Sequence, residues 1–174
     1  MSKAILIFLV SFSTLSVQAQ SFSHEDSVRI HGQKILDNKI QPSDDDLTFA
    51  CLANLYADNA TDRAFYFKVY VVMARKSDAA LSEGICGYIK TYLELYPAEA
   101  IEDFNHLSKA DQDRFIEYVA FEFYASGEDY KADIDDYFNS IASRCNTCNI
   151  DNPTVLYLKR TLLDKAKSMV DSDL

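Results

Sequence analysis

Several residue types that shape other folds are scarce in this chain of 174 residues. It holds four glycines, three prolines and no tryptophan. An all-β domain needs turn residues about every 8–12 positions, and this supply of glycine and proline does not meet that need. Four glycines also cannot build a glycine-rich phosphate loop, and the lack of tryptophan removes the commonest platform for stacking a sugar ring. The composition therefore favours helices.

Histidine is equally rare, and no familiar catalytic motif is present. The three histidines are His24, His31 and His106, and the first two lie too far apart on a helix to grip one zinc ion. Neither His-x-x-x-His nor Gly-x-Ser-x-Gly occurs. Asn59-Ala60-Thr61 matches the acceptor for N-glycosylation, which matters in a eukaryotic source. The residues therefore predict no metal ion, no cofactor and no catalytic site.

Long apolar runs are absent too. The longest near the start is Ala4 to Val10, whereas a membrane-spanning helix needs about 20 apolar residues. Lys3 precedes this run, and Val17-Gln18-Ala19 places small residues at positions −3 and −1 of a cut before Gln20. This layout predicts a cleaved secretory signal peptide over residues 1–19 and a single helical domain over residues 20–174. We expect an exported protein that is not embedded in a membrane, and we favour the bacterial periplasm over the extracellular space.

Positive charge is in short supply. The chain carries 17 Lys and Arg against 27 Asp and Glu, a formal net charge of −10, and removal of the signal takes away Lys3 as well. Phosphate backbones and anionic lipids would repel such a molecule, which argues against a nucleic-acid partner. The charge suits solubility, and it also suits a surface complementary to a basic partner protein.

Apolar residues at helical spacing, together with capping residues such as Ser43 and Thr61, predict seven or eight helices with short joints. Residues 64–73 (AFYFKVYVVM) also fit the period of a strand. Because no second segment resembles a strand, and a lone strand leaves its backbone groups unpaired, we predict a buried helix there. The expected fold is an all-α single domain, an irregular helical bundle or a short α-solenoid, stapled by disulfides. The expected helices cover residues 24–38, 44–58, 64–73, 77–96, 97–107, 109–125, 129–144 and 153–170.

All four cysteines lie beyond the predicted signal, and an even number in an exported chain predicts disulfides. Cys51 and Cys86 each lie on the apolar stripe of a predicted helix. The two glycines that flank Cys86 would permit the close backbone approach that a bridge needs. We therefore predict a Cys51–Cys86 disulfide and a local Cys145–Cys148 disulfide. The alternatives are metal binding by the C-x-x-C pair and cross-pairing with Cys51 and Cys86.

Acidic and tyrosine side chains alternate between Glu117 and Tyr137, and tyrosine is favoured in protein interfaces. We therefore predict that the protein binds another protein and has no catalytic activity, and its acidic charge favours a basic partner. In size, export, acidity and helical content it is similar in type to periplasmic immunity or inhibitor proteins that neutralise exported toxins. The predicted contact residues are Glu117, Tyr118, Glu122, Tyr124, Asp129, Tyr130, Asp133, Asp136 and Tyr137.

The alternative function is a periplasmic thiol–disulfide oxidoreductase. Cys145-Asn146-Thr147-Cys148 has the spacing of the thioredoxin-like redox motif. In those enzymes the motif opens a helix, and the helix dipole lowers the pKa of the first thiol. Here the motif follows a predicted helix and lacks the βαβ context, so binding is the preferred prediction.

Overall fold

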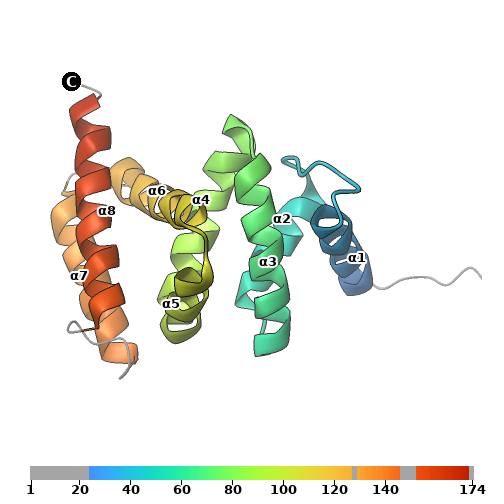
Figure 1. Cartoon of the computed structure of the whole chain (residues 1–174), viewed down its shortest axis with the longest axis horizontal. Helices are drawn as coiled ribbons and strands as arrows, with labels where there is room; N and C mark the ends of the chain where they lie inside the picture. The colour runs from blue at the N-terminus through green and yellow to red at the C-terminus, as the bar shows by residue number, and fades with distance from the viewer. Residues whose placement is uncertain (1–23, 127–128, 146–151, 173–174) are drawn as a thin grey trace, which may run out of the picture.

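The computed structural model describes residues 24–126, 129–145 and 152–172, and these residues form α-helices, one turn of 3-10 helix and no strand (Figure 1). This confirms the predicted all-α class. None of the helices in these ranges is long and apolar enough to cross a lipid bilayer. The elements are α1 (His24–Leu36), α2 (Asp46–Ala53), η1 (Asn54–Tyr56), α3 (Ala60–Lys76), α4 (Ala79–Leu95), α5 (Pro97–His106), α6 (Lys109–Ser126), α7 (Tyr130–Arg144) and α8 (Pro153–Ser172).

The segment that also fitted a strand lies in helix α3. Its buried side chains recur three and four residues apart, which is the period of a helix that packs on one face. The helical prediction for this segment is therefore confirmed. The buried residues of α3 are Arg63, Tyr66, Phe67, Val69, Tyr70, Met73 and Ala74.

Short polar side chains cap the helices at their first turns. Asp45 accepts a hydrogen bond from the Thr48 amide at 2.9 Å, and Asn59 accepts one from the Asp62 amide at 2.8 Å. Such contacts satisfy amides that have no partner within the helix. The caps therefore fall two residues away from the predicted Ser43 and Thr61. Ser43 instead donates to the Asp45 carboxylate at 2.6 Å, which supports the true cap.

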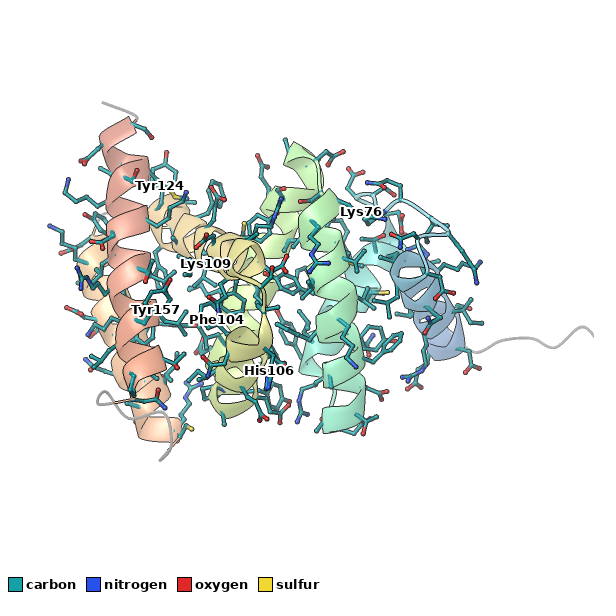
Figure 2. The ribbon with its side chains drawn as sticks, viewed as in Figure 1. Lys76, Phe104, His106, Lys109, Tyr124 and Tyr157 are labelled. Atoms are coloured by element: carbon teal, nitrogen blue, oxygen red, sulfur yellow. The ribbon has the colours of Figure 1, made fainter. Side chains whose placement is uncertain are left out.

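The helices follow one another along the long axis of the molecule, with α1 at one end and α7 and α8 at the other (Figure 1). Contacts join near neighbours in the chain: α1 packs on α2 and α3, α4 on α5 and α6, and α6 on α7 and α8. This succession resembles a short, irregular α-solenoid. Helix α8 also reaches α5, where the Tyr157 ring lies 6.3 Å from that of Phe104 (Figure 2).

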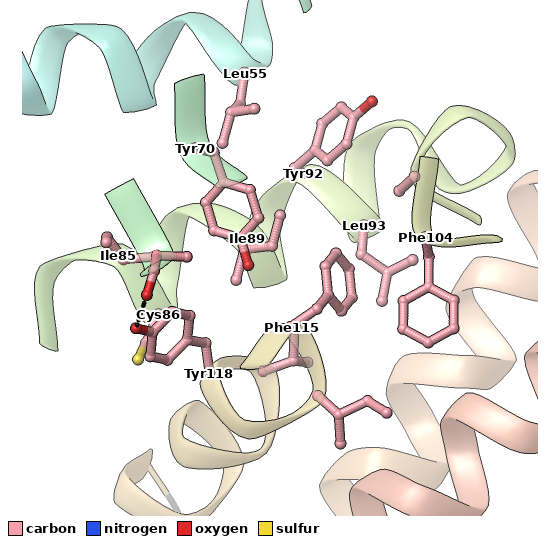
Figure 3. Close-up of a cluster of buried hydrophobic side chains, with 14 of the residues drawn as sticks. Leu55, Tyr70, Ile85, Cys86, Ile89, Tyr92, Leu93, Phe104, Phe115 and Tyr118 are labelled. Carbon is pink, nitrogen blue, oxygen red and sulfur yellow. Dashed lines mark hydrogen bonds between the residues drawn. The ribbon is translucent and has the colours of Figure 1, made fainter. Parts of the chain in front are cut away.

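Aromatic side chains dominate the middle of the core (Figure 3). The ring of Tyr70 lies 5.5 Å from Phe67 and 6.5 Å from Phe115, and Phe115 lies 5.3 Å from Phe104. The Phe67 ring in turn lies 5.7 Å from Tyr92. Edge-on and tilted pairs at these separations add to the stabilisation from burial. The rings therefore join α3, α4, α5 and α6 into one body.

The predicted Cys51–Cys86 disulfide is wrong, because both cysteines are free and buried. The Cys51 thiol faces α1 and donates to the Val28 carbonyl at 3.4 Å, whereas the Cys86 thiol donates to the Ser82 carbonyl of its own helix at 3.1 Å. Gly84 does mark a close approach, but to the Phe49 ring: a Cβ there would lie 2.4 Å from Phe49 Cε1. The two apolar stripes thus face different neighbours.

The second predicted pair has a different outcome. Cys145 follows the last residue of α7 as its C-cap, and Cys148 lies outside the described residues. A Cys145–Cys148 disulfide therefore stays a prediction. The described part of the chain gives no support for a disulfide staple between helices.

Cys51 and Cys86 should resist thiol reagents in the folded protein. Burial raises the pKa of each thiol to about 12, so the reactive thiolate is scarce near neutral pH. Without any reductant, we expect an alkylating agent to modify both residues after unfolding in denaturant and neither before it. Peptide mass spectrometry distinguishes the sites. If Cys51 and Cys86 were not alkylated in the unreduced, denatured protein, the two residues would be joined in a disulfide after all.

Candidate functional site

A hollow of about 360 Å³ opens between α4, α6 and the end of α8. Four of its residues come from α6 at positions 114, 117, 118 and 121, a spacing that places them on one face of the helix. The joint between α3 and α4, the first half of α4, and α8 supply the rest. The lining residues are Ser77, Ser82, Glu83, Cys86, Arg114, Glu117, Tyr118, Phe121 and Met169.

One wall of the hollow is a network of hydroxyl groups. The Tyr118 hydroxyl lies 2.8 Å from Ser77 Oγ and donates to the Ala74 carbonyl at 3.2 Å. Ser82 Oγ donates to Ser77 Oγ at 2.9 Å, and Arg114 Nη1 donates to the same Ala74 carbonyl at 3.2 Å. Connected hydrogen bonds of this kind hold side chains in fixed orientations. The polar wall is therefore preorganised.

Tyr70 is also buried nearby, but its hydroxyl does not take part in this network. Its hydroxyl is fully enclosed and has no hydrogen-bond partner among the described residues. An unpaired buried hydroxyl costs about 1–3 kcal/mol, whereas a paired one contributes about 1 kcal/mol. Tyr70 and Tyr118 thus form a matched pair of buried tyrosines with opposite hydrogen-bonding states.

Removal of the two hydroxyls should have opposite effects. We expect Tyr70→Phe to raise the free energy of unfolding by about 1 kcal/mol, because an unsatisfied group is deleted. Tyr118→Phe should lower it by about 1 kcal/mol, because Ser77 and Ala74 lose a partner. Urea denaturation measures both. A loss of stability in Tyr70→Phe would show that the hydroxyl has a partner in solution.

Cys86 forms part of the other wall, beside Tyr118 (Figure 3). Burial, together with the nearby Glu122 carboxylate, raises the pKa of its thiol to about 12. A nucleophilic cysteine needs the reverse, a depressed pKa from a cation or a helix N-terminus. With Phe121 and Met169, Cys86 therefore serves the hollow as an apolar, polarisable surface.

Charged groups stand at the rim. Glu117 is paired with Lys165 at 3.0 Å, which neutralises it. Arg114 is exposed and has one hydrogen bond to Ala74, so most of its five donors stay available. Glu83 is exposed and forms no ion pair with any residue that the structure describes. The hollow therefore presents one available cation, one available anion and an apolar wall.

An ion pair to the buried Asp111 carboxylate fixes the start of α6, and so the position of Arg114 one turn later. Arg75 binds both carboxylate oxygens of Asp111, at 2.7 and 2.6 Å, and Ser108 Oγ donates to the same carboxylate. The Asp111 side chain is 6% exposed. Hydrogen bonds from Arg75 lower the pKa of this carboxyl from 3.8 to about 2.

This shift predicts a contribution to acid stability. Because the folded pKa lies below the unfolded one, the contribution is fully present above about pH 4 and is lost as the pH falls towards 2. Since Arg75 is half exposed, we expect about 1–2 kcal/mol. The stability difference between the wild type and Asp111→Asn should therefore shrink between pH 5 and pH 2, measured by urea denaturation. A difference that stays constant over this range would contradict the pairing.

The predicted contact residues do not form one surface. Glu117 and Tyr118 line the hollow, and Glu122 lies beside it, near Gly87. Tyr118 is 8% exposed and committed to the hydroxyl network. Tyr137 is also 8% exposed, and its hydroxyl donates to the Lys90 carbonyl at 2.7 Å. Both tyrosines are therefore mostly buried, and their hydroxyls are hydrogen-bonded within the chain.

The remaining predicted residues gather at the end of the molecule. Asp129, Asp133 and Asp136 are exposed at positions i, i+4 and i+7 of one face of α7, with Asp129 also capping the helix. Tyr124 and Tyr130 are half-buried. The opposite face of α7 packs in the core through Ile134, Tyr137, Phe138 and Ile141.

Several residues of the hollow were missed by the sequence analysis, notably Ser77, Ser82, Glu83 and Arg114. They come from two helices and a joint, and no short motif joins them. One signal was present: the face of α6 that holds Tyr118 and Phe121 also holds Arg114 and Glu117, so charges interrupt an apolar stripe. A mixed face of this kind is typical of a helix that borders a polar hollow.

Within the described ranges, no group of three or more His, Cys, Asp or Glu side chains is placed to hold a metal ion. Comparison of the chain with protein-family models, with curated proteins and with solved structures finds no match.

Proposed function

We propose that this chain is an exported binding protein that recognises a basic protein partner through the outer face of α7, and that it acts as an inhibitor or immunity-like protein rather than an enzyme. The observation that carries the proposal is the row Asp129, Asp133 and Asp136. Neither the Asp133 carboxylate nor the Asp136 carboxylate forms a hydrogen bond or an ion pair with any described residue. The neighbouring Asp135, by contrast, is neutralised by Lys159 at 2.7 Å.

The shape of α7 supports the same proposal. Its inner face is held in the core, so the exposed carboxylates stand on a rigid element. Tyr130 borders the row and supplies an aromatic surface of the kind that interfaces favour. Carboxylates that form no ion pair with a described residue, in a chain of net charge −10, attract a basic partner and speed its association.

The oxidoreductase alternative is less well supported. Cys145 follows the C-terminus of α7, where the helix dipole is negative and disfavours a thiolate. Redox motifs use the opposite end of a helix, where the dipole lowers the pKa of the thiol. Replacement of Cys145 and Cys148 by serine should therefore leave partner binding unchanged.

The test compares two variants of equal charge. Asp133→Asn/Asp136→Asn removes two carboxylates from α7, and Asp44→Asn/Asp58→Asn removes two exposed ones elsewhere. Each exported protein is used to capture partners from periplasmic extract, at low salt and at about 0.5 M salt, where charge attraction is screened within a few ångströms. We expect one basic protein that binds the wild type and the control, binds the α7 variant at least tenfold more weakly, and dissociates in salt.

Other outcomes would overturn the proposal. If both variants lost the partner to the same extent, the effect would be one of net charge alone. If both variants kept the partner as the wild type does, the α7 face would be excluded as the binding surface. Intact mass of the exported protein tests the processing: a chain that begins at Gln20 is expected from the signal sequence.

A further inference from the structure

We propose that the hollow between α4, α6 and α8 binds a free apolar α-amino acid in its zwitterionic form. This inference is independent of the proposed protein partner, because the α7 face and the hollow share no residue. It rests on three features of one site: an available guanidinium, an available carboxylate and an apolar wall.

The guanidinium of Arg114 defines the end that takes the carboxylate of the ligand, and the hydroxyl network beside it fixes the Ala74 carbonyl that orients it. Arg114 is oriented by its hydrogen bond to the Ala74 carbonyl and retains further N–H donors in a planar fork. Ser77 and Ser82 lie at the same wall, where their hydroxyl hydrogens are used within the network that holds the Ala74 carbonyl beside Arg114. Planar bidentate recognition of a carboxylate is the chemistry for which arginine is best suited.

The carboxylate of Glu83 defines the place for the ammonium group. Glu83 lines the same hollow from α4, while the other rim acid, Glu117, is occupied by Lys165. A ligand with a carboxylate alone would leave Glu83 unpaired, and one with an amine alone would leave Arg114 unpaired. A zwitterion satisfies both charges, so the two ends together select for an amino acid.

The apolar wall determines which side chain the bound amino acid carries. Phe121, Met169 and Cys86 present an aromatic ring, a flexible thioether and an unionised thiol. Methionine adapts to ligands of different shape, which suits leucine, methionine and phenylalanine alike. The volume of about 360 Å³ lies near the lower end of ligand pockets, which run from about 300 to 1,000 Å³, so the occupant is small.

The experiment is isothermal titration calorimetry of the purified exported protein with ligands that remove one feature at a time. L-Leucine, L-methionine and L-phenylalanine carry all three features. 4-Methylpentanoate lacks the ammonium of leucine, 3-methylbutylamine lacks its carboxylate, and glycine lacks its side chain. We expect the three zwitterions to bind, and each truncated ligand to bind at least tenfold more weakly than leucine.

Two variants assign the charges to residues. Arg114→Gln should weaken the binding of leucine at least tenfold and leave the binding of 3-methylbutylamine unchanged. Glu83→Gln should weaken the binding of leucine and leave the binding of 4-methylpentanoate unchanged. Arg160→Gln and Glu25→Gln are matched controls at exposed positions outside the hollow, and leucine should bind them as it binds the wild type. Because this crossed pattern depends on the ligand, a general loss of folding cannot produce it.

Three results would overturn the proposal. The first is no heat of binding for any of the three zwitterions at ligand concentrations up to about 10 mM. The second is leucine binding that survives the double replacement of Arg114 and Glu83. The third is an amine or an acid that binds as tightly as leucine, which would assign the hollow to a singly charged ligand.

Discussion

Replacement of Arg63 by methionine is expected to lower the free energy of unfolding by about 3 kcal/mol, because it removes a buried cation that donates to several acceptors at once. Arg63 is 5% exposed in the first turn of α3. Its Nε lies 2.8 Å from Glu99 Oε2, and its Nη1 donates to the carbonyls of Ala57 and Asp58 at 2.7 and 2.8 Å. The guanidinium also lies 3.9 Å from the centre of the Tyr96 ring.

These contacts join three separate parts of the chain. Ala57 and Asp58 belong to the loop before α3, Glu99 to α5, and Tyr96 to the end of α4. Hydrogen bonds to the Glu99 carboxylate raise the pKa of the guanidinium, so Arg63 keeps its positive charge. Because Glu99 is 38% exposed, water can hydrate it once Arg63 is gone, which holds the loss near the lower end for a broken buried pair.

Two further variants separate geometry from charge. Arg63→Lys keeps the cation but cannot form the planar fork, and it should cost about 1–2 kcal/mol. Arg160→Met removes an exposed arginine and should change stability by no more than about 0.5 kcal/mol. Urea denaturation measures all three. Equal stability of Arg63→Met and Arg160→Met would show that the buried contacts contribute nothing.

The helices could be predicted from the sequence because their signals are local. Asp and Asn residues occur at the starts, apolar residues recur at helical spacing, and glycine and proline are few. Even residues 64–73, which fit two periods, were assigned correctly by one physical condition, that a lone strand cannot pair its backbone. The errors of two residues at Ser43 and Thr61 arose because neighbouring polar side chains compete for the same cap.

The cysteine pairing could not be predicted because a stripe shows that a side chain is buried, but not which helix it faces. Cys51 faces α1, and Cys86 lies at a hollow bordered by α6. Gly84 was recognised as a place of close approach, yet the approaching group is the Phe49 ring. The same holds for Tyr118 and Tyr137. The neighbouring residues in the sequence do not show whether a tyrosine is exposed or is buried with its hydroxyl hydrogen-bonded inside the protein.

The hollow could not be predicted from the sequence for a related reason. Its polar wall combines Ser77, Ser82 and Tyr118, which lie up to 41 residues apart. Each of these residues has a common local use, as a cap or as a position on a helix face, so none stands out alone. Only the packing of α4 against α6 brings the three hydroxyls together.

Replacement of Phe115 by alanine is expected to have the largest effect of all, a loss of about 3–5 kcal/mol in the free energy of unfolding. Phe115 is fully buried in α6, and its ring lies edge-on to Phe104 from α5 and to Tyr70 from α3 (Figure 3). Deletion of the ring removes the transfer free energy of a large apolar group and leaves a cavity. The surrounding rings cannot fill this cavity, because each is held by its own helix.

A matched aromatic on the surface provides the control. Tyr157 also lies against Phe104, at 6.3 Å, but it is 39% exposed, so Tyr157→Ala should cost no more than about 1 kcal/mol. Phe115→Leu keeps most of the volume and should cost about 1–1.5 kcal/mol, which preserves a measurable transition if the alanine variant unfolds. Urea denaturation at one temperature ranks the three variants. If Phe115→Ala and Tyr157→Ala lost similar amounts, the interlocked rings would not be the part of the core that joins the helices, and the packing of α3, α5 and α6 would have to be stabilised elsewhere.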